Sequence, residues 1–172
     1  TSVAPVAATV KSTDILSKLF KSPKTRPASF PKKRLPCWSP ALYLPGEKRG
    51  NDNVQAITAL VYDFDHATSA PEVLADKLDK IGVWYGIHTT WSHRPSEPRY
   101  RVTLFLSRPL TPGEYSAAWE NGLRAMGYDA GVDRQARNIS RHYALPARRE
   151  GEEYFSRIRL DGVPLDSDKI SK

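Results

Sequence analysis

Residues 59–65 read Ala-Leu-Val-Tyr-Asp-Phe-Asp, an apolar run that ends in two carboxylates. The apolar run over residues 57–64 is typical of a β-strand that is covered on both faces. Because strand side chains repeat every two residues, Asp63 and Asp65 should point to the same face, about 7 Å apart along the chain. Two carboxylates at that spacing suit one or two hard metal ions. The alternative is that both acids begin a solvated loop, since Asp is common after strands.

Positive charge is concentrated at the beginning of the chain. The 172 residues suffice for one domain with a substantial core. The entire net charge of +7 falls within residues 1–34, which carry eight bases, one acid and prolines at 23, 27 and 31. We expect a flexible, basic, Pro-rich arm over 1–34 and a folded domain over 35–172. The arm, including Lys32, Lys33 and Arg34, would attract nucleic-acid phosphates; a solubilising tail or interdomain tether is the alternative.

Cysteine content and hydropathy limit the cellular compartments in which the protein is expected. The single cysteine, Cys37, excludes an internal disulfide and any multi-cysteine zinc site. The sequence contains no apolar run long enough to cross a bilayer, and the first residues do not resemble a signal peptide. We therefore expect a soluble, cytoplasmic protein in a reducing environment, without a membrane partner.

The remaining sequence alternates between helical and strand patterns. Capping-box residues at 69–72 and 111–114, each with a proline, predict helices that end at Gly82 and Gly127, with Ser69 as the first N-cap. Strands are predicted at 57–64, 83–90, 99–106 and 141–145, with the second and third antiparallel to each other. Residues 154–165 predict a weak terminal hairpin around Asp161-Gly162. The predicted fold is α+β, with a mixed, largely antiparallel sheet and helices packed on it.

Charged residues gather at the predicted strand ends. His93, Arg99 and Arg101 lie around the turn between the second and third strands, and Asp133 and Arg141 precede the fourth. With the first two acids, Asp133 completes three carboxylates, a set that can hold two divalent ions, while forked guanidinium groups suit a triphosphate. Each of these residues also has a structural interpretation, as a strand-edge charge paired with an acid or as an exposed turn residue.

Four of these segments resemble the primase-polymerase domains of phage and plasmid replication proteins, which belong to the archaeo-eukaryotic primase superfamily. The resemblance covers residues 59–146. It is carried by LVYDFD at 60–65, TTWSHRP at 89–95 with PRYRV at 98–102, SRPLTPGEY at 107–115, and Asp133 with SRHYALP at 140–146. The turn over 89–102, with the Ser-Arg-Pro that follows it, is the most specific part.

The resemblance implies a role for each matching residue. In that family an acid pair and a third acid bind divalent metals, here Asp63, Asp65 and Asp133 with Mg²⁺ or Mn²⁺. A motif histidine contacts the phosphates of the incoming nucleotide, and His93 matches it most nearly. The family pattern places a serine two residues before this histidine, whereas here the serine is adjacent, so His88 is the alternative. The resemblance also implies a primase-polymerase-like fold.

We therefore expect a DNA primase or primase-polymerase domain, a nucleotidyltransferase that joins nucleoside triphosphates on a single-stranded DNA template during phage or plasmid replication. A helicase domain or protein is a further expected partner. His93, Arg99, Arg101 and Arg141 would bind the triphosphate. Because the folded part is electrically neutral, the template would be held by base stacking on Trp91 and Tyr100, or by the arm.

Two alternatives from other classes remain open. One is a replication-initiator domain that binds nucleic acid or a nucleotide without catalysis. The other is a metal-dependent nuclease that uses the same acids. The absence of a His-x-His pair on a strand disfavours the rolling-circle nickases.

Overall fold

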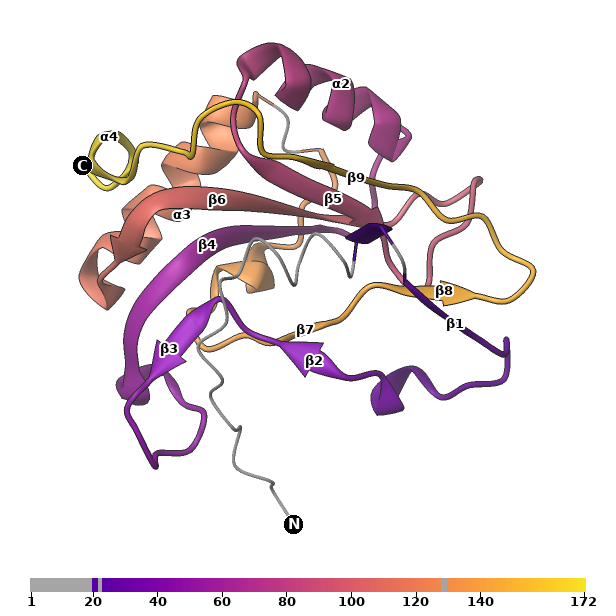
Figure 1. Ribbon diagram of the computed structural model, residues 1–172, viewed down its shortest axis with the longest axis horizontal. Coiled ribbons are helices and arrows are strands. Elements are labelled where there is room, and N and C mark those ends of the chain that lie inside the picture. Colours follow the sequence, from indigo (N-terminus) through magenta and orange to yellow (C-terminus); the bar gives the residue numbers. More distant parts are fainter. Residues whose placement is uncertain (1–19, 22, 128–129) are drawn as a thin grey trace.

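A five-stranded antiparallel sheet forms the centre of the computed structural model, which describes residues 20–21, 23–127 and 130–172 (Figure 1). Its strand order is β3-β4-β6-β5-β9, and each neighbouring pair runs antiparallel. The strands are β3 (Ala41–Tyr43), β4 (Val54–Phe64), β5 (Tyr85–Thr89), β6 (Tyr100–Leu110) and β9 (Ser156–Arg159). The long central strands β4 and β6 are therefore covered on both edges, as their apolar sequences require.

Two short ribbons lie on one side of this sheet. Strand β1 (Lys24–Arg26) pairs in parallel with β8 (Ala147–Arg149), and β2 (Cys37–Trp38) pairs antiparallel with β7 (Tyr143–Ala144). In Figure 1 both ribbons lie below β5 and β6, and helix α2 lies above β5. The helices are α2 (Pro71–Ile81), α3 (Pro112–Met126) and α4 (Ser167–Ile170), with 3₁₀ turns η1 (Lys32–Arg34), η2 (Asn51–Asn53) and η3 (Arg134–Arg137).

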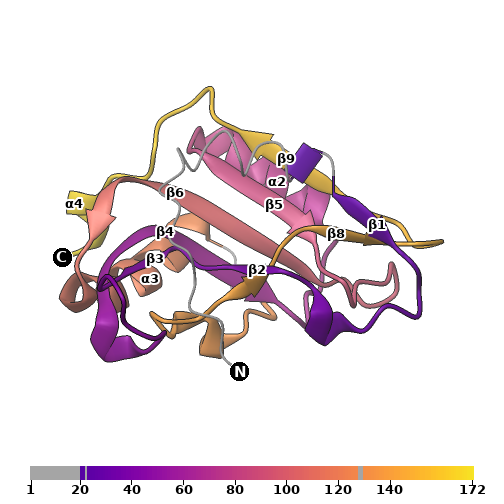
Figure 2. The same cartoon turned by 60° about the horizontal axis from the view of Figure 1, so that its bottom comes forward.

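One face of the sheet packs against α2 and α3. On this face the indole of Trp119 donates a hydrogen bond to the Val61 carbonyl, and the Tyr62 hydroxyl donates to the Trp119 carbonyl, at 3.1 and 2.9 Å. The hydroxyl of Tyr85 in β5 reaches the carbonyl of Ala75 in α2. Figure 2 shows both helices behind the strands, with β1, β2 and β8 in front. The two helices thus cover one face of the sheet, and the ribbons cover the opposite face.

The ribbon-covered face has a small apolar cluster of its own. Phe20 is buried against Gly86, where any side chain would collide with the phenyl ring, and its ring meets His88 edge-on with centroids 5.1 Å apart. Phe105 is buried in the same cluster. Glycine at position 86 therefore lets the segment before β1 pack directly on the sheet.

The predicted α+β class and largely antiparallel sheet are confirmed. The predicted antiparallel pairing of the second and third strands is β5 with β6, and the capping box of α3 is present, with Glu114 accepting from the Thr111 backbone N–H. Glycines 82 and 127 end α2 and α3 in the left-handed conformation.

Three local predictions were wrong. Helix α2 has Ala70 rather than Ser69 at its N-cap. The predicted strand 141–145 shrinks to two residues that pair with β2, outside the main sheet, because Pro146 follows it and Arg101 donates to the Ala144 carbonyl. The predicted terminal hairpin is absent from the described chain, because β9 pairs with β5 instead of folding back on itself.

The expected arm meets the domain before residue 35. Residues 1–19 and 22 lie outside the described residues. Within the rest of the expected arm, Phe20 is buried and β1 hydrogen-bonds to β8. The charge and proline content of this segment predicted an unfolded chain. Instead, the buried Phe20 and the pairing of β1 with β8 attach it to the domain. No helix in the described part of the chain is both long and apolar enough to cross a membrane.

Candidate functional site

A polar row crosses the ribbon-covered face of the sheet. Asp63 in β4 lies directly opposite Arg101 in β6, which lies directly opposite His88 in β5. Residues in such register share one face, so the three side chains are neighbours. All three are buried, with exposed fractions of 5%, 8% and 2%. Arg101 Nε donates to Asp63 Oδ1 at 2.6 Å, which pairs two charges that burial would otherwise strongly disfavour.

Arg101 is held from the ribbon side as well. One terminal nitrogen donates to the carbonyl of Ala144 at 2.9 Å, and the guanidinium lies 4.8 Å from the ring centre of Tyr143. Its charge also acts on His88: burial and then Arg101 lower the pKa of that imidazole to about 3. His88 is therefore neutral near pH 7, and its Nδ1 lies 2.9 Å from the Thr89 carbonyl.

Asp133 reaches the same place from the loop that follows α3. Gly131 has a φ of 81°, and a Cβ there would collide with the carbonyl group of His66. This close approach places Val132 opposite Phe64, and the Asp133 backbone N–H donates to the Asp63 carbonyl at 2.7 Å. Glycine is thus required for Asp133 to lie at the end of β4.

Arg141 joins the two acids. Its Nη2 lies 3.1 Å from Asp133 Oδ2 and 3.9 Å from Asp63 Oδ2. Because both distances are measured from one atom, the two carboxylate oxygens are at most 7.0 Å apart, the sum of 3.1 and 3.9 Å. Carboxylates at such a separation are close enough to share two metal ions about 4 Å apart.

A cavity of about 580 Å³ opens beside these residues. Asp63, Asp65, Arg101, Arg141 and His88 line it. Asp65 follows the end of β4, and its side chain is 41% exposed and 4.0 Å from Arg99 Nη1. Both acids of the opening motif therefore face one cavity, as the two-residue repeat of a strand predicts.

The two candidate histidines face different cavities. His88 lines the acid-bearing cavity. His93 lines a separate cavity of about 480 Å³ with Glu72, Arg148 and Glu153, and its Nδ1 accepts from the Arg99 backbone N–H. Burial lowers the pKa of His93. On geometry alone, His88 is the histidine placed with the acids.

Of the residues expected to contact the template, some line the acid-bearing cavity and one lies in the core. Trp91, Lys32 and Lys33 line the acid-bearing cavity, and Arg34 is exposed. Tyr100 instead lies on the helix-covered face, fully buried, with its ring stacked 5.0 Å from that of Phe64. A base cannot reach that ring, so Tyr100 contributes to the core rather than to a binding surface.

The remaining predicted arginine, Arg99, is paired beside the cavity, and Tyr143 within the cavity was not predicted as a site residue. Arg99 forms an ion pair with Glu97 in addition to its contact with Asp65. Tyr143 lies under Arg101 and lines the acid-bearing cavity. Its place could be found from sequence only through its position in the segment 140–146.

The acid-bearing cavity fits a divalent cation by donor type. Carboxylate oxygens are the ligands that Mg²⁺ and Mn²⁺ prefer. The side chains do not form a finished cage, because the described residues contain no group of three that could hold an ion as they stand. Asp63 Oδ1 contacts Arg101 and Asp63 Oδ2 lies near Arg141. A bound ion would have to exchange with these guanidinium contacts.

A family model described as the VapE N-terminal domain matches residues 42–172. The chain belongs to this family. The matched residues include β4 to β9. They therefore include the three aspartates and the two arginines that line the acid-bearing cavity, Arg101 and Arg141.

One similar structure is the primase-polymerase (PrimPol) AEP domain of cyanophage S-2L, PP-N190, with 12% sequence identity and a TM-score of 0.47. The alignment covers 72% of this chain, and it spans 63% of the length of that chain. No curated protein matches the sequence.

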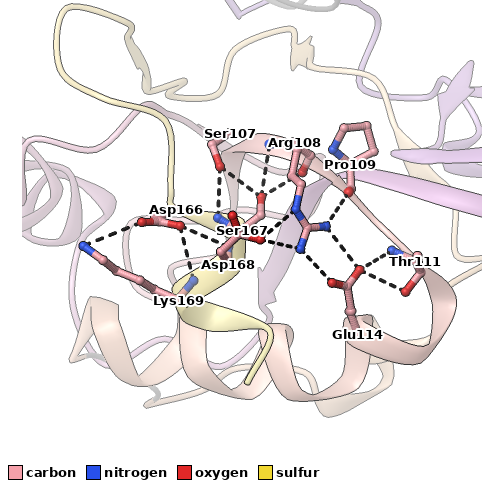
Figure 3. Close-up of polar contacts among 9 residues, drawn as sticks. All are labelled: Ser107, Arg108, Pro109, Thr111, Glu114, Asp166, Ser167, Asp168 and Lys169. Atoms are coloured by element: carbon pink, nitrogen blue, oxygen red, sulfur yellow. Dashed lines mark hydrogen bonds and ion pairs between the residues drawn. The ribbon is translucent and has the colours of Figure 1, made fainter.

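The Ser-Arg-Pro segment of this VapE N-terminal domain is architectural. Figure 3 shows Arg108 at the end of β6 donating to Glu114 at the start of α3 and to Asp168 in α4. Ser167, which is fully buried, donates to the Arg108 carbonyl at 2.8 Å, and its backbone N–H donates to Ser107 Oγ at 3.0 Å. The Ser-Arg-Pro of the resemblance thus holds the C-terminal helix in place and does not line the acid-bearing cavity, whereas the preceding turn lines it through Thr89, Thr90, Trp91 and Arg101.

Proposed function

We propose that this domain binds a nucleoside triphosphate in the acid-bearing cavity and, with Mg²⁺ or Mn²⁺, joins nucleotides on a single-stranded DNA template during phage or plasmid replication. The observation that supports this most is Arg141 Nη2, which lies within 4.0 Å of both Asp63 and Asp133. Carboxylates for a cation and guanidinium groups for phosphates therefore meet at one point, as nucleotidyl transfer requires.

In this proposal each part of the chain has a separate task. Arg141, whose side chain is 28% exposed, forms forked hydrogen bonds to the triphosphate, while Arg101 supplies positive charge from beneath. A divalent cation on the three aspartates would polarise the α-phosphate. The 3′-hydroxyl oxygen forms a bond to the α-phosphorus, the bond to the leaving pyrophosphate breaks, and the hydroxyl proton passes to solvent. His88, opposite Arg101 on the neighbouring strand, is neutral near pH 7 and adds no charge to the cavity.

Binding the nucleotide requires an exchange of partners. In the structure the carboxylates of the cavity are already neutralised by guanidinium groups. When the phosphates form ion pairs with the guanidinium groups, the carboxylates lose these partners and can bind a cation. Nucleotide and metal are thus expected to bind cooperatively, each releasing a partner for the other.

A second candidate function is nucleotide or nucleic-acid binding without catalysis. It is favoured by the contacts of Asp63, both of whose carboxylate oxygens lie within 3.9 Å of an arginine nitrogen. If those pairs never open, the cavity binds phosphate and takes up no cation. A metal-dependent nuclease would use the same acids and would shorten the labelled strand.

A single assay separates these functions. The 172-residue chain is incubated with a labelled primer on a single-stranded template, deoxynucleotides and Mn²⁺, beside Asp65→Asn and the remote control Asp161→Asn. We expect elongation by the wild type and by the control, and a loss of at least about 100-fold for Asp65→Asn, because a metal ligand is removed. Absence of elongation with retained nucleotide binding supports the non-catalytic function, and shortened strands support the nuclease.

A further inference from the structure

A second, basic cavity adjoins the acid-bearing one. It has a volume of about 740 Å³ and shares Arg141 and His142 with its neighbour. Three further arginines line it, Arg49, Arg134 and Arg137, together with two side-chain amides. No acidic residue of the described chain is among the lining residues. The two cavities thus meet at Arg141 but differ in chemistry.

The walls of the basic cavity are fixed by hydrogen bonds. Asp133 accepts from the backbone N–H of Gln135 and so begins η3, which carries Arg134 and Arg137. Asn138 Oδ1 accepts from the backbone N–H and the hydroxyl of Ser140 after that turn. Arg49 Nη1 donates to the Ser140 carbonyl at 2.9 Å, which brings the loop before η2 alongside. The loop before η2 and the segment from η3 to Ser140, which are far apart in sequence, therefore form the walls of the basic cavity.

Positive charge is in excess around this cavity. Arg134 and Arg137 share one carboxylate, that of Glu120, and their side chains are 56% and 50% exposed. Arg49 has no carboxylate within 4.0 Å among the described residues. With Arg101 included, five guanidinium groups share three carboxylates, so two positive charges remain without an acidic partner. An anion with several charges would complete this balance.

His142 supports the same conclusion from a different property. It lines both cavities. Burial first, and then the charges of Arg49 and Arg141, lower the pKa of its imidazole. A neutral imidazole at the junction adds a hydrogen-bonding group without adding charge.

We propose that the basic cavity binds backbone phosphates of a single-stranded nucleic acid whose reacting end lies in the acid-bearing cavity. A strand carries one phosphate per nucleotide, so it continues past the reacting site and presents further anions next to it. Carboxylates line only the first cavity, so the second holds phosphate without the metal ligands that would make it react. The choice of a strand rests on the proposed function, whereas phosphate binding itself does not.

The test measures binding of a fluorescein-labelled single-stranded oligo(dT) by anisotropy, across a range of salt concentrations. The variant Arg134→Ala/Arg137→Ala removes two guanidinium groups that no other site residue depends on. We expect its Kd to rise about tenfold at 0.1 M salt, and the slope of log K against log salt to become shallower by about 1.4, since each lost contact with single-stranded DNA accounts for about 0.7. Arg134→Lys/Arg137→Lys should keep the wild-type slope.

Two controls make the outcome specific. Arg159→Ala removes an arginine at the end of β9 that is 47% exposed and paired with Asp161, and this variant should bind oligo(dT) as the wild type does. Inorganic triphosphate is titrated in parallel as a probe without a strand. The proposal is overturned if Arg134→Ala/Arg137→Ala retains wild-type affinity and slope, or if it loses only triphosphate binding. Because no nucleotide addition is measured, failure of catalysis would not affect this result.

Discussion

Arg101 and Asp63 form a buried ion pair across β6 and β4, with Arg101 Nε 2.6 Å from Asp63 Oδ1. Their side chains are 10% and 7% exposed. The pair is held by backbone register and by the Ala144 carbonyl, so it is both part of the core and part of the proposed site. A substitution at either residue should therefore change both the stability of the fold and the binding of a ligand in the proposed site.

Substitution of Asp63 should therefore destabilise the fold. Asp63→Asn leaves the Arg101 charge buried without its partner, which costs about 3 kcal/mol in the free energy of unfolding. Urea denaturation followed by circular dichroism measures this. Asp65→Asn is the matched control, because its carboxylate is 41% exposed, and it should change stability by less than about 0.5 kcal/mol. Equal effects of the two substitutions would contradict the buried pair.

The buried His88 predicts a pH dependence of stability. Its pKa is about 3 in the fold and 6.5 ordinarily. Above pH 6.5 the imidazole is neutral in both states and contributes nothing. As the pH falls from 6.5 toward 3 the unfolded chain binds a proton that the fold excludes, so stability decreases by up to about 1.4 kcal/mol per pH unit.

The variant His88→Gln isolates this contribution. Unfolding free energies of the wild type and of His88→Gln are measured in urea from pH 7 to pH 4. The difference between them should change with pH in favour of the variant as the pH falls. Two parallel curves would show that His88 does not titrate below its ordinary pKa.

Gly131 should be necessary for the position of Asp133. Gly131→Ala places a Cβ against the His66 carbonyl and adds strain at a φ of 81°, which together should cost about 3 kcal/mol and weaken nucleotide binding. Gly46→Ala is the matched control, because its φ is 79° and a Cβ there meets nothing within 4 Å. The control should lose only about 1 kcal/mol. Unfolding in urea and titration with a fluorescent nucleotide measure both effects.

Ser167 should contribute strongly to stability although it is remote from the proposed site. The buried hydroxyl joins α4 to β6, as Figure 3 shows, and Ser167→Ala leaves the Arg108 backbone groups without that partner. We expect a loss of about 2 kcal/mol in unfolding free energy, with unchanged nucleotide affinity. Ser116→Ala, on the exposed face of α3, should change stability by less than about 0.5 kcal/mol. A loss of nucleotide affinity in Ser167→Ala would assign the segment to the site.

The sequence predicted the elements whose signals are local. The apolar run at 57–64, the capping box at Thr111 and the glycine ends of both helices depend on neighbouring residues, and the structure has them. Strands β2 and β7 have two residues each, too few to show a period of two. Their pairing arises from contacts between distant segments, which a local pattern does not contain.

The site was predictable in composition more than in arrangement. The spacing of Asp63 and Asp65 correctly placed both on one cavity. The register that pairs Asp63 with Arg101 and His88 could not be read from the sequence, because it depends on how three strands align. Tyr100 could not be placed either, since one step along a strand moves a side chain to the opposite face.

The most direct test of the proposed function is single-nucleotide incorporation by Asp133→Asn in the presence of Mn²⁺. Asp133 lies at the junction of the acids through Arg141, yet it is outside the buried pair with Arg101, so the fold should persist. We predict that incorporation falls at least about 100-fold in Asp133→Asn, while Asp161→Asn equals the wild type. Wild-type incorporation by Asp133→Asn, with its fold verified by circular dichroism, would contradict a metal-assisted site built on these aspartates.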